Sequence, residues 1–307
     1  MHPFPNKWIG VGGLLLAACL LAPFASAQTA NEGLSPTLAN IKRTHVVRLG
    51  YRESSPPFSF LDHSNRPIGY SLELCEAIVE EIGVEVDDPN LRIEYVKVTS
   101  DDRIPAVTEN KIDLECGSTT ANAERAKLVA FSPLIFVAGT KLMVPKASTI
   151  SAPTDLKGKT VVVTKGTTNE QAMHNVDKKF SLGLNIVTTP DHEQSYQMLV
   201  DGKADAFATD DILLYGLIAR HKTQDKFKVT GEYLSYDPYG IMFRKGEPQL
   251  KAVVERTFQK LGSGRDLIPL YNKWFVGRLP TGEKLGVSIS PQLEEAFKVL
   301  DGTQGNN

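Results

Sequence analysis

Short apolar runs along the chain alternate with stretches in which apolar residues recur every three or four positions. The runs at 45–51, 160–164 and 186–189 are rich in β-branched residues, which predicts buried strands. Between them, the periodic stretch that begins near Tyr70 predicts an amphipathic helix, and Gly83 is expected to end it. This alternation of strands and helices predicts an α/β protein.

Two segments are suited to connect separate domains. The long apolar run at 130–144 can pass from one domain to another, and 236–244 reads as a second crossing strand. Residues 31–40 look like an exposed tether before the first strand. Near the other end, Pro248 is well placed at the first position of a helix, and 271–275 closes what we expect to be the final short helix.

An internal similarity supports two domains of the same kind. Residues 109–118 and 201–210 each contain a helix end, a turn with lysine, a strand that begins with aspartate, and polar residues at the carboxyl end of that strand. The similarity predicts two α/β domains whose strand ends face a shared cleft. Asp210 and Asp211 should point to opposite sides of their strand end, so only one of them needs to face the cleft.

A strand end and a helix start are predicted to meet at residues 116–125. Thr120 suits the N-cap of a helix that begins at Ala121, and the first backbone N–H groups of such a helix favour an anion. Arg125 would lean back over that position and bind a carboxylate with two hydrogen bonds. A capped helix with a solvated arginine is the alternative interpretation.

Three other strand ends carry candidate ligand-binding residues. Ser100 is a plausible helix cap, and Arg103 lies in the first turn after it, where a cation opposes the helix dipole unless an anion lies between them. Arg52 follows the first strand, although an ion pair with the adjacent Glu53 is the commoner role of a lone arginine. His192 follows another strand, and a lone histidine is more often structural than functional.

Composition limits the classes of protein to consider. A chain of 307 residues has the length of two domains, and 41% hydrophobic with 23% charged residues is typical of a globular protein. The net charge of −2 at pH 7 gives no reason to expect binding to nucleic acid. The spacing of histidine and cysteine matches no metal site, so we expect neither a metal nor a cofactor.

The N-terminus has the pattern of an export signal. Lys7, an apolar stretch at 8–21 and the small residues at 25–27 form the three regions of a signal peptide, and the stretch is too short to span a membrane. We expect residues 1–27 to be removed and the protein to be exported to the periplasm. Lipidation of Cys19 is the competing interpretation, but the apolar run continues past Cys19 into a good cleavage site.

Cys75 and Cys116 remain after cleavage. Cys75 lies on the apolar face of a predicted helix and Cys116 at a strand end. An exported protein of this size can build its core without disulfides, so we expect two buried free thiols. A bridge is the alternative, because both elements belong to one domain.

Taken together, these residues resemble the periplasmic solute-binding proteins of ABC importers for polar amino acids, in particular those that bind glutamate and aspartate. Singly each resembling block is weak, but the blocks run through nearly the whole mature chain in the family's order. They are 52–55, 100–105, 115–120, 124–125, 155–159, 166–168, 191–192, 210–211 and 273–275.

The resemblance implies a two-lobed type II fold, in which two crossing strands join α/β lobes that close by hinge motion on a ligand in the interdomain cleft. Lobe 1 would comprise residues 38–138 and 243–302, and lobe 2 residues 139–242, followed by a disordered tail at 303–307. The implied function is to bind L-glutamate or L-aspartate and deliver it to the membrane permease of an ABC importer. We expect a monomer.

The resemblance also implies a role for nine residues. Those that bind the α-carboxylate and amino groups of the ligand would be Ser118, Thr120, Thr168, Asp210 and Arg125. Those that bind the side-chain carboxylate would be Arg52, Ser100, Arg103 and His192. Three arginines, with or without a charge on the histidine, opposite one aspartate suit a ligand with two carboxylates and one ammonium, because buried charges must be paired.

Three residues depart from the family pattern. Ser71 stands where the wider family usually has an acidic residue, and Tyr51 and Met242 also differ from the expected residues. Some proteins of this fold are periplasmic dehydratases, but catalysis needs a general acid or base in the cleft, and the carboxylates here have binding roles. We therefore expect no enzyme, with a ligand-binding protein that feeds a chemoreceptor or sensor as a further alternative.

Overall fold

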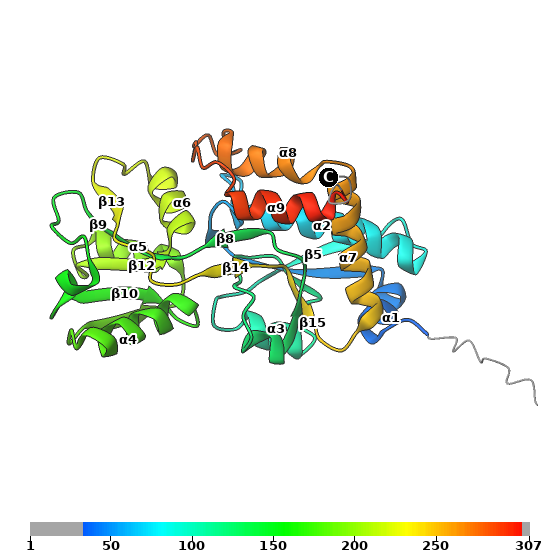
Figure 1. The fold of residues 1–307 in the computed structure, drawn as a ribbon. Helices are drawn as coiled ribbons and strands as arrows, with labels where there is room; N and C mark the ends of the chain where they lie inside the picture. The colour runs from blue at the N-terminus through cyan, green and yellow to red at the C-terminus, as the bar shows by residue number, and fades with distance from the viewer. Residues whose placement is uncertain (1–32, 303–307) are drawn as a thin grey trace, which may run out of the picture. The chain divides into compact units, whose positions relative to one another are not determined.

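The computed structural model describes residues 33–302, in which helices and strands alternate as the α/β prediction requires (Figure 1). The predicted signal peptide at 1–27, the alternative lipid site at Cys19 and the predicted tail at 303–307 lie outside the described residues. No described helix is long and apolar enough to cross a membrane.

The first sheet has five strands in the order β5 (Arg92–Lys97), β1 (Val46–Tyr51), β6 (Leu114–Glu115), β15 (Met242–Arg244) and β7 (Val129–Phe131). β1 is parallel to β5 and β6, whereas β15 is antiparallel to β6 and β7. One apolar cluster joins this sheet to α1 (Pro36–Thr44), α2 (Tyr70–Val86) and α7 (Pro248–Ser263), and another joins it to α3 (Arg103–Thr108). The sheet is therefore covered on both faces.

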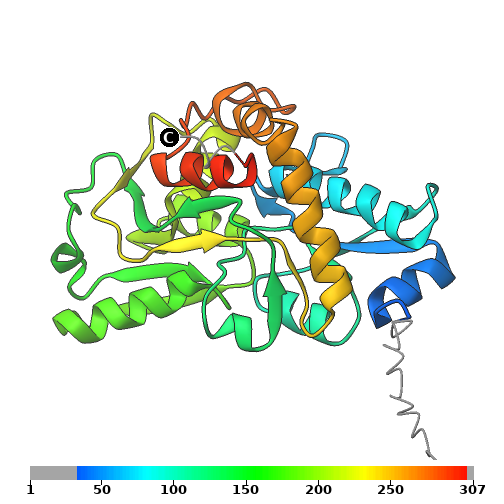
Figure 2. The same ribbon diagram turned by 45° about the vertical axis from the view of Figure 1, so that its right-hand side comes forward.

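The second sheet has the order β11 (Asn185–Thr189), β10 (Thr160–Thr164), β12 (Ala206–Asp210), β9 (Thr140–Pro145) and β13 (Phe227–Thr230). Val161 and Val163 pack toward α4 (Thr168–Phe180), whereas Val162 packs toward α5 (His192–Val200) and α6 (Asp211–His221). Alternate residues of a strand face opposite sides of a sheet, which explains why a continuous valine run makes a strand with helices on both faces (Figures 1 and 2).

Two short strands connect the regions of the two sheets. β8 (Phe136–Ala138) and β14 (Asp237–Tyr239) pair antiparallel with each other, apart from both five-stranded sheets. The predicted crossing strand at 236–244 is thus two strands, β14 and β15, and the run at 130–144 contains three. A smaller sheet joins β2 (Ser54–Ser55), β3 (Ser59–Leu61) and β4 (Pro67–Ile68), and one 3₁₀ turn spans Pro153–Leu156.

Two helix boundaries differ from the prediction. The predicted tether at 31–40 ends in α1, because Leu38 and Ile41 are three positions apart and both are buried. Gly83 does not end α2, which continues to Val86 and closes at Asp87 in the left-handed conformation (φ 56°). A side chain at position 83 would lie 2.8 Å from the Asp88 carbonyl oxygen, so this glycine is required by close packing.

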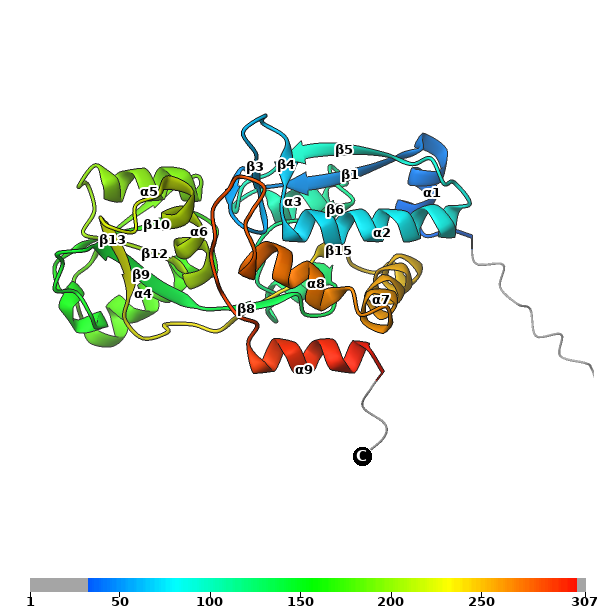
Figure 3. The ribbon, with the colours of Figure 1, turned by 90° about the horizontal axis from the view of Figure 1, so that it is seen from above.

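The C-terminal region contains a helix that was not predicted. α8 (Leu267–Tyr271) continues into a π-turn at Asn272–Val276, so the expected short helix at 271–275 is not the last one. α9 (Pro291–Leu300) follows and packs on α7 (Figure 3). The sequence contains two signals for α9. Ser290 is an N-cap residue that accepts a hydrogen bond from the N–H of Leu293, and Leu293 and Phe297 are spaced to bury one face of the helix.

Cys75 and Cys116 form a disulfide, so the expectation of two free thiols is wrong. The apolar face of α2 places Cys75 directly against the residue after β6, and the two Cα atoms are 6.2 Å apart. That distance lies in the usual range for disulfides. The sequence indicated that both cysteines are buried, but the contact depends on how α2 packs on the sheet.

The two similar sequence segments make the same contact in each sheet. Asp113 accepts a hydrogen bond from the backbone N–H of Arg48 at 2.8 Å, and Asp205 accepts one from the backbone N–H of Thr160 at 2.9 Å. In both cases the aspartate before one strand binds the backbone of the parallel neighbour. The aspartate in each of the two similar segments therefore joins its strand to the parallel neighbouring strand at a fixed position.

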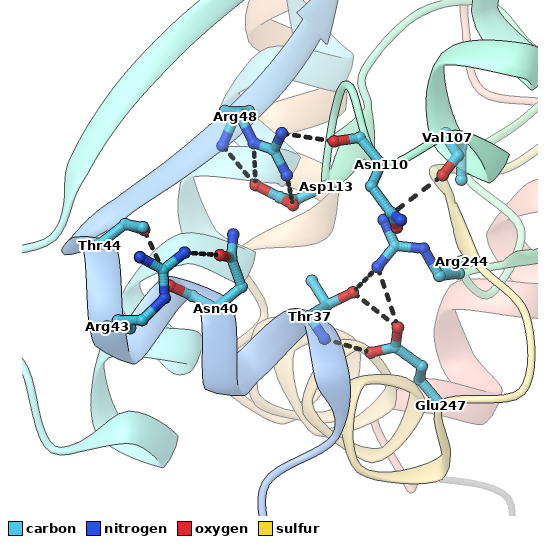
Figure 4. Close-up of polar contacts among 10 residues, drawn as sticks. All are labelled: Thr37, Asn40, Arg43, Thr44, Arg48, Val107, Asn110, Asp113, Arg244 and Glu247. Atoms are coloured by element: carbon cyan, nitrogen blue, oxygen red, sulfur yellow. Dashed lines mark hydrogen bonds and ion pairs between the residues drawn. The ribbon is translucent and has the colours of Figure 1, made fainter.

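A buried polar group fixes α1 to the start of α7 (Figure 4). Glu247 accepts hydrogen bonds from the backbone N–H of Thr37 at 3.0 Å and from its hydroxyl at 2.7 Å. Arg244 donates to the Glu247 carboxylate at 3.1 Å and also to the Thr37 hydroxyl. One carboxylate thus satisfies three donors from two distant parts of the chain.

The disulfide should stabilise the fold strongly. The cysteines are 41 positions apart, and in the chain-entropy model closing such a loop contributes about 4 kcal/mol. We expect reductant to lower the guanidinium midpoint of the wild type markedly. The double variant C75S/C116S should have a low midpoint that reductant does not change, and equal midpoints for oxidised and reduced wild type would contradict the expectation.

Glu247→Ala should destabilise the protein by about 3 kcal/mol, because it leaves the buried Arg244 charge and the Thr37 N–H without their acceptor. The matched control is Glu255→Ala on the same helix. Glu255 is half-buried, and its one ion pair within the described residues is with Lys251 one turn away, so its loss should change the free energy of unfolding by less than about 0.5 kcal/mol. Urea denaturation of both variants provides the comparison.

Candidate functional site

The nine predicted site residues all follow, or end, parallel strands of the two sheets. Eight of them are buried, and Thr168 is half-buried. They lie after β1 (Arg52), β5 (Ser100, Arg103), β6 (Ser118, Thr120, Arg125), β10 (Thr168) and β11 (His192), and Asp210 is the last residue of β12. Carboxyl ends of parallel strands are the usual ligand-binding edge of α/β sheets.

Arg52 and Arg103 form a buried pair of like charges. Arg52 donates from Nη2 to the Ser100 hydroxyl at 2.6 Å, and its backbone N–H donates to the Ser59 hydroxyl at 2.8 Å. Burial, and next the charge of Arg103, lower the pKa of Arg52 to about 10. Within the described residues, Arg52 Nη1 and Arg103 Nε have no hydrogen-bond partner. The two guanidinium groups therefore retain donors for an anion.

Ser100 does not cap the helix that follows it. The N-cap of α3 is Asp102, whose carboxylate accepts a hydrogen bond from the N–H of Thr99 at 2.6 Å. Arg103 does lie in the first turn of α3, as predicted. Because Asp102 turns back on Thr99, the Ser100 hydroxyl is left to bind Arg52.

The helix predicted to begin at Ala121 does not form. The N–H of Ala121 donates to the Pro238 carbonyl at 2.7 Å, and Thr120 makes an isolated β-bridge with Tyr239. These contacts hold the chain extended along β14, so Thr120 is not an N-cap and no helix N-terminus is present there to bind an anion. Only a 3₁₀ turn at Arg125–Lys127 remains.

Arg125 is placed by contacts other than a helix. Its Nη1 donates to the Thr120 carbonyl at 3.0 Å, and its Nη2 donates to the Gly166 carbonyl at 3.3 Å, which belongs to the loop before α4. Burial, and then the charge of Arg103, lower the pKa of Arg125 to about 9. Arg103 thus acts on both of the other buried arginines.

Glu115 is a charged member of this group that the sequence reasoning missed. It is fully buried at the end of β6, and one oxygen accepts a hydrogen bond from the Thr119 hydroxyl at 2.6 Å. A side chain at Gly117 would overlap the other oxygen and lie 2.9 Å from Arg52 Cγ. Glu115 raises the pKa of all three arginines, so it is their internal counter-charge.

His192 is buried beside the arginines but is not charged. Its Nδ1 lies 2.8 Å from the Thr164 hydroxyl. Burial, followed by the charges of Arg52 and Arg103, holds the pKa of His192 well below its usual value. The sequence left the charge of this histidine open, and the lowered pKa favours a neutral imidazole near neutral pH.

Asp210 and Asp211 point to different surroundings, as predicted for neighbours at a strand end. Asp210 accepts hydrogen bonds from the Asn169 side-chain amide at 2.9 Å and from the Tyr239 hydroxyl. Asp211 instead accepts one from the Tyr233 hydroxyl at 2.8 Å. Burial, and next the charge of Asp237, raise the pKa of Asp210 to about 7.

Asp237 is a second buried residue that was missed. It belongs to β14 and accepts hydrogen bonds from the Thr120 hydroxyl at 3.0 Å and from the Ser235 hydroxyl. The Thr120 hydroxyl also lies 3.3 Å from that of Thr168. The sequence did offer a signal for Asp237, because it is an acidic residue inside a predicted crossing strand. Burial of a carboxylate is unfavourable without a partner, so an acidic residue at such a position indicates a polar contact.

The three departures from the family pattern have different surroundings. The Ser71 hydroxyl donates to the Gly117 carbonyl at 2.8 Å, so the first turn of α2 supports the loop that carries Ser118. Tyr51 packs edge-on against Tyr95, and Met242 is buried in β15.

These residues form a site with two regions of opposite charge. Arg52 and Arg103 lie with Glu115 in one region, and Asp210 and Asp237 lie in the other. Arg125 lies between them, because it donates to the Thr120 carbonyl while the Thr120 hydroxyl donates to Asp237. In the described part of the chain the Ser118 hydroxyl has no hydrogen-bond partner, and no cluster of histidine, cysteine and carboxylate side chains is suited to a metal ion. Such an arrangement suits a small zwitterion with more than one acidic group.

Comparisons with known proteins identify the family of the chain. The model of the family described as bacterial extracellular solute-binding proteins, family 3, matches residues 47–277. A Pseudomonas aeruginosa protein named L-glutamate/L-aspartate-binding protein is 41% identical over 285 residues, which cover 92% of this chain and 94% of the relative. The glutamate/aspartate import solute-binding protein of Escherichia coli K12 is 36% identical with the same coverage.

A solved structure gives the same picture of the fold. A crystal structure of a mutant ArgBP from T. maritima matches with a TM-score of 0.70 at 27% identity, covering 78% of this chain and all of the other. The chain belongs to family 3 of the bacterial extracellular solute-binding proteins. The predicted two-lobed type II fold is confirmed.

The raised pKa of Asp210 makes the stability of the protein depend on pH. The folded protein keeps a proton on Asp210 between about pH 4 and 7 that the unfolded chain has lost, so the free energy of unfolding falls as pH rises through this window. Asp210→Asn should remove this loss. Relative to wild type, the variant should gain stability from pH 5 to 8, by about 3 kcal/mol.

Chemical denaturation at several pH values measures this difference. Asp225→Asn, an exposed change in the same lobe, is the control and should follow the wild type throughout. A difference between Asp210→Asn and wild type that stays constant with pH would show that Asp210 ionises normally.

Proposed function

We propose that this protein is the substrate-binding component of an ABC amino-acid importer, which binds L-glutamate or L-aspartate in the periplasm and delivers it to the membrane permease. The observation that carries the proposal is the group of three buried arginines together with a pair of buried aspartates; within the described residues, Arg52 and Arg103 each retain a donor without a partner. Two relatives whose names specify glutamate and aspartate support it. Export would follow cleavage of residues 1–27, and we propose a monomer.

The two ends of the ligand would meet different groups. At the amino-acid end, Arg125 and the hydroxyls of Ser118, Thr120 and Thr168 would bind the α-carboxylate and amino groups, and Asp210 would accept hydrogen bonds from the ammonium. At the other end, the side-chain carboxylate would lie against Arg52, Ser100, Arg103 and His192. A neutral imidazole still donates one hydrogen bond, so His192 needs no charge for this role.

Glu115 changes the balance of charge in the site. Its carboxylate compensates one of the three arginine charges and leaves two, which equals the number of carboxylates in glutamate or aspartate. A neutral amino acid would leave one guanidinium without a counter-charge, which is costly in a buried site. The site therefore favours acidic amino acids over their amides.

Closure would bring the two lobes together on the ligand by bending at β8 and β14. Contacts already join the two sides in this structure. Arg125 donates to the Gly166 carbonyl, and Lys165 makes an ion pair with Asp101 at 2.8 Å. We propose lobe boundaries at 38–138 with 243–302, and at 139–242.

Two arginine variants test the assignment of the ligand's ends. Arg125→Ala should weaken every amino-acid ligand by at least tenfold, since losing one partner of a buried charged pair costs about 2–5 kcal/mol. Arg103→Met should weaken glutamate and aspartate by a similar factor. It should leave any weak binding of glutamine unchanged or stronger, because the amide needs no second cation.

Calorimetric titration of both variants with glutamate, aspartate and glutamine at one salt concentration gives the required affinities. Arg66→Met is a suitable control, since Arg66 is exposed and pairs only with Asp62. Equal loss of glutamate and glutamine affinity in Arg103→Met would refute the side-chain assignment. No binding of glutamate or aspartate by the wild type would refute the proposed function itself.

A further inference from the structure

A continuous chain of hydrogen bonds connects the two buried aspartates of the site. The side-chain amide of Asn169 donates to Asp210 at 2.9 Å and to the Thr140 hydroxyl at 2.7 Å. The Thr140 hydroxyl lies 2.6 Å from that of Ser235, which donates to Asp237. Thr140 and Ser235 lie on the two segments that join the sheets, so the chain of hydrogen bonds passes through both connections.

Strand β14 contacts both carboxylates directly. Asp237 and Tyr239 are two positions apart in β14, so their side chains lie on the same face of the strand. The Tyr239 hydroxyl donates to Asp210, and Asp237 accepts from the hydroxyl of Thr120, one of the proposed ligand-binding residues. Asp237 is therefore connected to two residues of the proposed amine end: to Thr120 by a direct hydrogen bond, and to Asp210 through Tyr239 of the same strand.

The two carboxylates are both buried, and within the described chain neither forms an ion pair with a cationic side chain. Asp210 is 3% and Asp237 1% exposed, and their hydrogen-bond partners in the described chain are the neutral Asn169, Tyr239, Thr120 and Ser235. A buried pair of like charges is unfavourable unless a cation joins them or one member is protonated. An ammonium group is the cation that an amino-acid ligand supplies.

We propose that Asp237 is the second carboxylate of the subsite for the ligand's ammonium group, and that it sets the preference of the site for amines by acting on Asp210 and Thr120. This inference rests on the proposed function and extends it. Asp237 is a positioning residue here: its hydrogen bonds and charge act through the two residues that would touch the ligand.

The charged surroundings of Asp210 define the expected pH dependence. The titratable and charged groups that influence it are Asp237 and Tyr239 from β14, Asp211 from α6, and Arg103 and Arg125 from the first lobe. Asp237 raises the pKa of Asp210, whereas a bound ammonium would lower it. Binding should then release a proton below about pH 7, so the affinity for an amine ligand should rise as pH increases toward 7 and become constant above it.

The test compares L-glutamate with glutarate, which has the same two carboxylates but no amine. Wild type, Asp237→Asn and Ser235→Ala are titrated calorimetrically with each ligand between pH 5.5 and 8.5. In Asp237→Asn the preference for glutamate over glutarate should fall at least tenfold, and the midpoint of the pH dependence should move to lower pH. Ser235→Ala removes a hydrogen bond of Asp237 but not its charge, so both properties should stay close to wild type.

The outcomes separate this inference from the function on which it rests. If Asp237→Asn keeps the wild-type preference and pH midpoint, Asp237 is only a structural support and the inference is wrong. If the wild type binds neither glutamate nor aspartate, the proposed function fails and the inference fails with it.

A measurement on the wild type alone covers the case in which the variants do not fold. Glutamate is titrated at pH 6.5 in two buffers with different heats of ionisation, which reports the number of protons released on binding. A release of a fraction of one proton is expected, and no release would overturn the paired-carboxylate subsite.

Discussion

Repulsion between three buried guanidinium groups is the constraint on which the rest of the site depends. Arg103 lowers the pKa of both Arg52 and Arg125, because a buried site screens its charge poorly. The Glu115 carboxylate compensates part of this charge. It fits there because Gly117 has no side chain, whereas a larger residue would overlap a carboxylate oxygen of Glu115. The remaining positive charge is available to a ligand with two carboxylates.

The fold stabilises this arrangement by placing each arginine after a different strand of one sheet. Parallel strands bring their carboxyl ends to the same edge, and apolar clusters on both faces keep the strands in register. The disulfide between Cys75 and Cys116 and the hydrogen bond from Ser71 to Gly117 tie α2 to the loop after β6. The charged loop is thus held by a rigid helix.

Sequence patterns correctly predicted the features that depend on residues close together in the chain. The valine run of β10, the proline that begins α7 and the aspartates that pair neighbouring strands were all identified from a few adjacent residues. The errors lie where a distant residue decides: Pro238 holds Ala121 extended in place of a helix, and α2 brings Cys75 to Cys116. The roles of Glu115 and Asp237 likewise depend on neighbours that are far away in the sequence.

Each end of the site contains buried like charges that repel each other, positive at one end and negative at the other. Arg52 and Arg103 repel each other at one end, and Asp210 and Asp237 repel at the other, so each end is least stable when it is fully charged and unpaired. A zwitterion with two carboxylates and one ammonium relieves both repulsions in a single binding event. Since Asp237 and Tyr239 belong to β14, relief at the amine end acts directly on a strand that connects the lobes, which links recognition of the ligand to the position of the hinge.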